Sequence, residues 1–256
     1  FSLTKKSSIF SIFGSANSGL SQRAIEKLSG LVVLLAGSVL LTSLSLAAPV
    51  PPASDFVSTA TCQGCHAEEV DAWAGSHHDW ALKLPTEETV KGDFSDVTFT
   101  HFGEISRFFR DGDAFMVTTT GPAGTPQTFP VKYVVGIEPL QQYLLETEPG
   151  RLQSLSIAWD RKGEKWYHLY PDQVIEPKDG LHWTGVYQNW NSRCADCHST
   201  GFEKNYDTAT NRFQSTWQEM NVACESCHGA GSGHVAWAKE YETEIQNVTP
   251  DPYAGT

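Results

Sequence analysis

The sequence has no cysteine outside three short segments, and it has few basic residues. All six cysteines lie in those segments, and the stretch 67–193 contains none. No cysteine is therefore left over for a second role elsewhere. Lys and Arg number 18 against 30 Asp and Glu, which gives a net charge of −12. This balance argues against binding to nucleic acid or anionic lipid and favours a partner with basic patches, although an acidic surface also serves solubility alone.

Each of the three segments has the pattern Cys-x-x-Cys-His. A single occurrence would also suit half of a zinc site or a redox dithiol. Neither requires the following histidine, which is present all three times. The pattern is the attachment site of c-type haem, where two thiols form thioethers and the imidazole binds the iron. The sequence therefore predicts three covalently bound haem c groups, attached at Cys62, Cys65, Cys194, Cys197, Cys224 and Cys227, with His66, His198 and His228 as proximal ligands.

Residues 1–48 have the order of a secretory leader. Basic residues precede an apolar run at 31–46, and small residues follow before Pro49. An uncleaved anchor is the alternative, because the segment 28–48 has 21 residues, close to the roughly 20 that span a bilayer. Haem c is attached outside the bacterial cytoplasmic membrane. We therefore expect an exported protein, periplasmic or extracellular, that contacts a membrane only if this segment is retained.

Three segments follow the leader. Residues 49–96 comprise a proline-rich linker and the first haem segment, in which a helix is expected at 67–73. Residues 97–180 form a β-rich block that has no cysteine and hence no haem attachment of its own. Residues 181–256 carry haems 2 and 3. His198 and His228 are 30 positions apart in the chain, so we expect these two haems to be neighbours and haem 1 to be brought in by the fold.

The β-rich block, at about 97–171, has the pattern of an antiparallel meander. β-branched and aromatic residues alternate with Gly, Pro and Asp turns. A short helix is expected at 139–145, with Pro139 in its first turn, followed by strands at 152–159 and 165–170. The predicted fold class is α+β: an irregular multihaem cytochrome c with short helices around the haems and an antiparallel β-rich insert.

The distal ligands must come from the six histidines that are not proximal. We expect His78, His182 and His234 to be distal ligands, whereas His77, His101 and His168 are less favoured and fit better as solvated or core histidines. His234 follows His228 by six residues through a glycine-rich loop. Wrapping both faces of one haem in so short a loop would be strained. His234 should therefore ligate a different haem, and the sequence does not fix which histidine pairs with which iron.

The chain resembles secreted multihaem c-type cytochromes that often carry tetratricopeptide repeats after the haem region. The resemblance runs from about 61 to 238, and its most specific stretches are Ser76–Ala81, Gly136–Leu144, Gly150–Gln153, Leu181–Gly185, Gln188–Asn191 and Cys224–Gly229. The last stretch, with His234, is similar to the wider cytochrome c-554 group. There the histidine after the glycine loop is the distal ligand of another haem. Family members usually carry further haem motifs and helical repeats, which this chain lacks.

Three functions fit these features, and the sequence favours an electron carrier over a catalyst. The first is single-electron transfer along closely spaced bis-histidine haems between redox partner proteins. The second is a subunit of an extracellular haem filament, whose partners are other haem proteins or copies of itself. The third is an oxidoreductase of a small nitrogen or sulfur compound, which needs one haem without a distal histidine.

Overall fold

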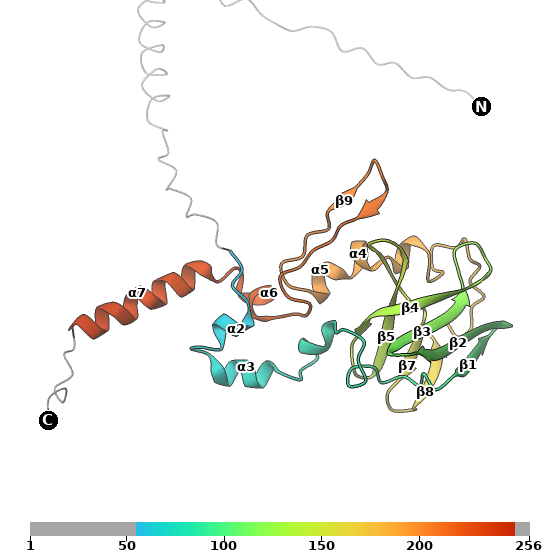
Figure 1. Cartoon of the computed structure of the whole chain (residues 1–256), viewed down its shortest axis with the longest axis horizontal. Helices are drawn as coiled ribbons and strands as arrows, with labels where there is room; N and C mark the ends of the chain where they lie inside the picture. Colours follow the sequence, from blue (N-terminus) through green and yellow to red (C-terminus); the bar gives the residue numbers. More distant parts are fainter. Residues whose placement is uncertain (1–54, 249–256) are drawn as a thin grey trace, which may run out of the picture. The chain divides into compact units, whose positions relative to one another are not determined.

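The computed structural model describes residues 55–248 (Figure 1). The predicted leader or anchor, residues 1–48, lies outside the described residues, as do residues 49–54 of the linker. Within 55–248, no helix combines the length and the apolar character that a membrane crossing requires. Both helices and antiparallel sheet are present, which confirms the α+β class.

One antiparallel sheet dominates the middle of the chain. Neighbouring strands pair in the order β1-β2-β3-β4-β5-β7-β8, and β6 also pairs with β5. The meander that the sequence predicts is therefore present. The strands are β1 (Val97–His101), β2 (Glu104–Asp111), β3 (Ala114–Thr120), β4 (Pro126–Val135), β5 (Leu140–Glu148), β6 (Arg151–Ser154), β7 (Ile157–Asp160) and β8 (Lys165–His168).

The helix predicted at 139–145 is wrong, because this stretch forms strand β5. Tyr143 pairs with Val134 of β4, and Leu144 pairs with Ser154 of β6, so β5 bonds to a strand on each side. Two-sided pairing and burial override the local helix preference. The predicted strand at 152–159 is likewise divided into β6 and β7.

An aromatic core fills the space enclosed by the sheet. Phe94, from the segment before β1, lies with its ring centroid 5.1 Å from Phe115, 5.4 Å from Tyr143 and 5.6 Å from Trp166. The Tyr143 hydroxyl is fully buried and accepts a hydrogen bond from the Gly92 N–H at 2.9 Å. Burial raises its pKa well above the usual range. Edge-to-face aromatic contacts of this kind add to the stability that apolar burial provides.

The two outer strands of the sheet approach each other. His101 at the end of β1 and His168 at the end of β8 have stacked rings, with centroids 3.9 Å apart and planes at 8°. These strands are first and last in the pairing order. The sheet is therefore curled like a barrel, and the stacked pair marks its seam.

The cysteine motifs lie in short helical segments on either side of this sheet in the sequence. Every helix there except α7 has seven residues or fewer, and the helix predicted at 67–73 is confirmed. The elements are α2 (Thr59–Cys62), α3 (Ala67–Trp73), η1 (Asp79–Ala81), η2 (Val186–Gln188), α4 (Trp190–Arg193), α5 (Ala195–His198), β9 (Tyr206–Asp207), β10 (Arg212–Phe213), α6 (Cys224–His228) and α7 (Ser232–Val248).

Candidate haem-binding site

Each motif folds into a helical turn that gathers its three functional side chains. In the first motif, the Cys65 and His66 N–H groups both donate to the Cys62 carbonyl, at 3.1 and 2.9 Å. The second motif repeats this pattern at 3.1 Å for both bonds, and the third forms α6. Residues three and four positions apart share one face of a helix. Both thiols and the imidazole of each motif therefore point to one side, as haem attachment requires.

All six thiols are free, and the second one of each motif is exposed. Burial, and after it the nearby Cys224 thiol and Glu225 carboxylate, raise the pKa of Cys62. Burial also raises the pKa of Cys194. Accessible thiols beside accessible imidazoles are the donor set that covalent haem needs.

The third motif lies between the other two in space. On one side, the Thr59 hydroxyl of α2 lies 3.9 Å from the Cys224 sulfur. On the other side, the Thr200 hydroxyl, two residues after His198, lies 2.6 Å from the Ser226 hydroxyl inside the third motif. The spatial order of the motifs is therefore first, third, second. Contact between the second and third motifs agrees with the expected neighbourhood of haems 2 and 3.

Glu225, a variable position of the third motif, joins three segments. Its side chain is buried, and its carboxylate accepts hydrogen bonds from the N–H groups of Val57 at 2.9 Å, Ser58 at 3.0 Å and Gly231 at 2.8 Å. Such charge-assisted bonds are stronger than neutral ones. Sequence reasoning missed this residue, since the motif tolerates any residue there and only the fold brings its partners together.

His66 and His234 face each other at a separation that fits one iron between them. Their ring centroids are 6.2 Å apart. A metal–imidazole bond is about 2 Å, and a ring nitrogen lies about 1 Å from its centroid when ring bonds are about 1.3 Å. Two rings on opposite sides of one iron should therefore have centroids about 6 Å apart. Both histidines are exposed.

His234 also begins an aromatic stack along α7. Its ring centroid lies 5.8 Å from that of Trp237, which lies 5.5 Å from that of Tyr241. The planes of the first pair meet at 29° and those of the second at 14°. Trp237 is 58% exposed, so its contact restricts the rotation of the His234 ring without burying it.

The segment from His77 to Ala81 lies between the second and third motifs. The His198 Nδ1 donates to the Ala81 carbonyl at 3.2 Å, so its Nε2 is the nitrogen available for iron. At the other end, the His78 carbonyl accepts from the Val222 N–H at 3.2 Å, just before the third motif. Both His77 and His78 are exposed.

The structure places His182 with His101 and His168 instead of with the motifs. These three histidines line one pocket that contains no motif residue. The Nδ1 of His182 lies 2.8 Å from the Thr184 hydroxyl and accepts from the Thr184 N–H at 3.3 Å. A backbone N–H can only donate, so the neutral ring carries its proton on Nε2. A histidine that binds iron through Nε2 needs the opposite tautomer. Of the predicted distal ligands, the structure thus brings His234 to a motif histidine and His78 close to the motifs, but not His182.

The arrangement fits haem on three counts: the helical turns, the accessible thiols and the separation of the His66 and His234 rings. In each motif the two cysteines would hold the macrocycle and the histidine would bind the iron. A motif supplies no distal ligand, so a second imidazole on each iron would have to come from another part of the chain.

Comparisons with known proteins found one matching family model and one similar solved structure. Residues 158–229, which include the second and third motifs, match the family model described as "Cytochrome c554 and c-prime". This match confirms the resemblance to the cytochrome c-554 group that the sequence predicts. A solved structure titled "Crystal Structure of Outer Cell Wall Cytochrome OcwA" matches with a TM-score of 0.46 and 18% identity, over 72% of this chain and 34% of that chain. The comparison with curated proteins found no match.

Proposed function

We propose that this protein is a three-haem c-type cytochrome that carries single electrons outside the cytoplasmic membrane. The observation that supports this most directly is the 6.2 Å separation of the His66 and His234 ring centroids. Bound haem supplies reversible one-electron chemistry at its iron. The protein holds each iron between two imidazoles and fixes the order of the sites.

The six non-proximal histidines divide into two groups of three. His101, His168 and His182 line the pocket of the curled sheet. The other three lie near the motifs: His234 serves the first haem opposite His66, and His77 and His78 serve the second and third haems, one each. Consecutive residues point their side chains in different directions, and backbone bonds tie their segment to both motifs. Every iron then has two imidazoles, which favours a carrier over a catalyst with an open iron.

Residues around the ligands keep the imidazoles in place. The Ala81 carbonyl holds the Nδ1 proton of His198, and hydrogen bonding of this kind fixes ring orientation and raises ligand basicity. Trp237 packs against His234 and restricts its rotation. The third motif stands between the other two, so the middle site touches both neighbours, which suits transfer along a row.

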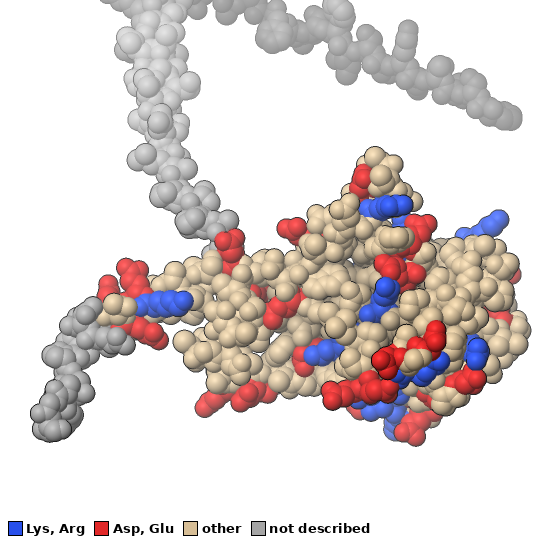
Figure 2. All heavy atoms as spheres, in the orientation of Figure 1, with Lys and Arg blue, Asp and Glu red and all other residues tan. Residues whose placement is uncertain are grey.

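The partner that fits this surface is a redox protein with a basic face. Figure 2 shows mainly acidic side chains on α3 and α7. Glu68, Glu69 and Asp71 lie on α3, and α7 carries Glu240, Glu242 and Glu244 against Lys239. Acidic surface around the first motif would raise the association rate with a basic partner at low salt.

Single histidine substitutions test the ligand assignment in the haem-loaded protein. We expect His234→Ala, His77→Ala and His78→Ala each to convert one of three haems from low spin to high spin. His182→Ala serves as the matched control and should leave all three low spin. Electron paramagnetic resonance at low temperature and visible spectra give the spin states. A high-spin haem in His182→Ala, or three low-spin haems in His234→Ala, would contradict the assignment.

A further inference from the structure

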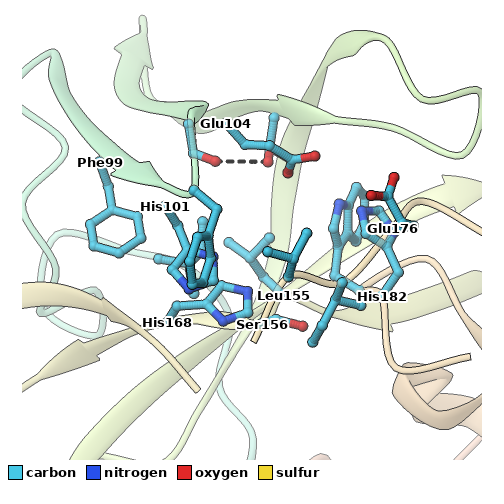
Figure 3. A pocket seen from close by; sticks show the side chains of 15 residues that line it. Phe99, His101, Glu104, Leu155, Ser156, His168, Glu176 and His182 are labelled. Atoms are coloured by element: carbon cyan, nitrogen blue, oxygen red, sulfur yellow. Dashed lines mark hydrogen bonds between the residues drawn. The ribbon is translucent and has the colours of Figure 1, made fainter. Parts of the chain in front are cut away.

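A pocket lies where the sheet curls on itself, apart from the cysteine motifs. Its cavity is about 160 Å³, and its lining comes from β1, β2, β3, β7 and β8 and from the segment 174–183. Figure 3 shows His101 and His168 together on one side and His182 on the other, with Leu155 and Ser156 between them. Mouths of curled or closed sheets are common ligand sites, and a cavity near this volume holds one benzene-sized ring.

Two histidines offer N–H donors that have no hydrogen-bond partner among residues 55–248. The Nδ1 of His168 accepts from the Tyr170 N–H at 3.1 Å, so its Nε2 carries the proton, as it does in His182. The Nε2 of His101 donates instead to the Pro171 carbonyl at 3.2 Å. The pocket therefore presents an imidazole N–H from each of two sides.

Ser156 provides a third polar group. It is 4% exposed, it lines the pocket, and its hydroxyl has no hydrogen-bond partner among the described residues. An unpaired buried hydroxyl is costly, and each such group calls for an explanation. A ligand atom that accepts a hydrogen bond from the Ser156 hydroxyl would provide such an explanation.

The remaining lining restricts the charge of the ligand. In the part of the chain that the structure describes, no Lys or Arg lines the pocket, while Glu104 and Glu176 do. Burial, and then the stacked His101 ring, lowers the pKa of His168 to about 4, so the ring is neutral at pH 7. Among the described residues, no three His, Cys, Asp or Glu side chains lie so as to coordinate one metal ion. A neutral organic molecule fits better than an anion or a metal.

Aromatic and aliphatic side chains form the walls, among them Phe99, Phe102 and Trp183. Such walls favour a flat ring. We propose that this pocket binds a small neutral quinone, whose two carbonyl oxygens accept hydrogen bonds from His168 and His182 on opposite sides of the ring. Ser156 then donates to one of these oxygens.

Equilibrium dialysis of the haem-loaded protein against methyl-1,4-benzoquinone, a neutral one-ring quinone, tests this proposal. We expect one methylbenzoquinone retained per chain, and weaker retention of toluene, which has the ring without the oxygens, and of benzoquinone sulfonate, which adds a charge. No retention of methylbenzoquinone, or equal retention of toluene, would overturn the proposal.

Substitutions locate the site. His168→Leu and His182→Leu should each weaken methylbenzoquinone binding at least fivefold, since one neutral hydrogen bond is worth about that factor. Ser156→Ala should weaken it by about fivefold without lowering the unfolding midpoint, because it removes an unpaired buried group. Ser95→Ala, at an exposed serine outside the pocket, is the matched control. Binding unchanged in all three pocket variants would place methylbenzoquinone elsewhere and overturn the proposal.

The same samples separate this proposal from the haem assignment. Three low-spin haems without methylbenzoquinone retention would overturn the quinone site alone. Methylbenzoquinone retention that depends on His168 and His182, in a protein with fewer than three low-spin haems, would contradict the haem proposal and support the quinone site.

Discussion

The curled sheet and the motif segments are built in different ways. Among residues 55–248, fifteen buried apolar residues form one core cluster, which lies mainly in the sheet. The second cluster has five, and two of these, Leu144 and Leu152, belong to β5 and β6. The helices at the cysteine motifs, α2, α5 and α6, have only four or five residues. The sheet thus has its own core, whereas the motif segments contribute little buried apolar surface.

This difference shows where haem contributes to folding. Helices this short are unstable in water unless tertiary packing holds them. When a bound group completes a site that the unfolded chain lacks, its binding energy becomes folding energy. We therefore expect the motif segments to depend on covalent haem and the sheet to fold without it.

The largest effect should come from preventing haem attachment. In a full-length chain with all six cysteines changed to alanine, we expect residues 55–80 and 220–244 to lose amide protection from hydrogen exchange. Strands of the sheet should keep it. Hydrogen exchange read by mass spectrometry would contradict the comparison if both regions lost protection together, or if neither did.

The next substitution destabilises the sheet instead of the motif segments. Phe94→Ala removes the ring at the centre of the aromatic core, and we expect it to lower the free energy of unfolding by about 3–5 kcal/mol. Phe102→Ala, at a side chain that is 59% exposed, is the control and should change it by less than about 0.5 kcal/mol. Denaturant titration followed by tryptophan fluorescence measures both. Equal effects of the two substitutions would mean that the aromatic cluster is not the core.

The Glu225→Gln substitution tests one contact that joins the motif segments to each other. The amide keeps the shape but loses the charge that receives three backbone N–H groups, so we expect a local loss of about 1.5–3 kcal/mol. Exchange of the amides at 57–62 should speed up while the sheet is unaffected. Glu68→Gln, on the exposed face of α3, is the control. Unchanged exchange in Glu225→Gln would show that this carboxylate does not join the segments.

The smallest expected effect is on the pH dependence of the stability of the sheet. The unfolded chain protonates His168 near pH 6.5, but burial keeps the folded ring neutral down to about pH 4. The unfolded state then binds more protons between these values, so stability falls as pH drops from 6.5 toward 4. Over this pH range, we expect the free energy of unfolding of the His168→Gln variant to fall less steeply than that of the unchanged protein. Parallel curves of unfolding free energy against pH would show that His168 does not titrate in this way.

Local patterns predicted what depends on a few neighbouring residues. The motif residues, the helix at 67–73 and the antiparallel meander are features of this kind. Long-range contacts decided the rest. Strand pairing on both sides makes 139–145 a strand instead of a helix. The curl of the sheet places His101 beside His168. His182 lines the same pocket as these two histidines. No local signal marks which histidine reaches which motif.

The most direct test is the haem content and spin state of the purified, oxidised protein. A pyridine haemochrome count together with low-temperature electron paramagnetic resonance measures both. The account predicts three haems per chain, all low spin, because each iron has two imidazoles. A high-spin signal near one haem in three, responsive to nitrite, hydroxylamine or cyanide, would contradict it and would show that one iron lacks its distal histidine.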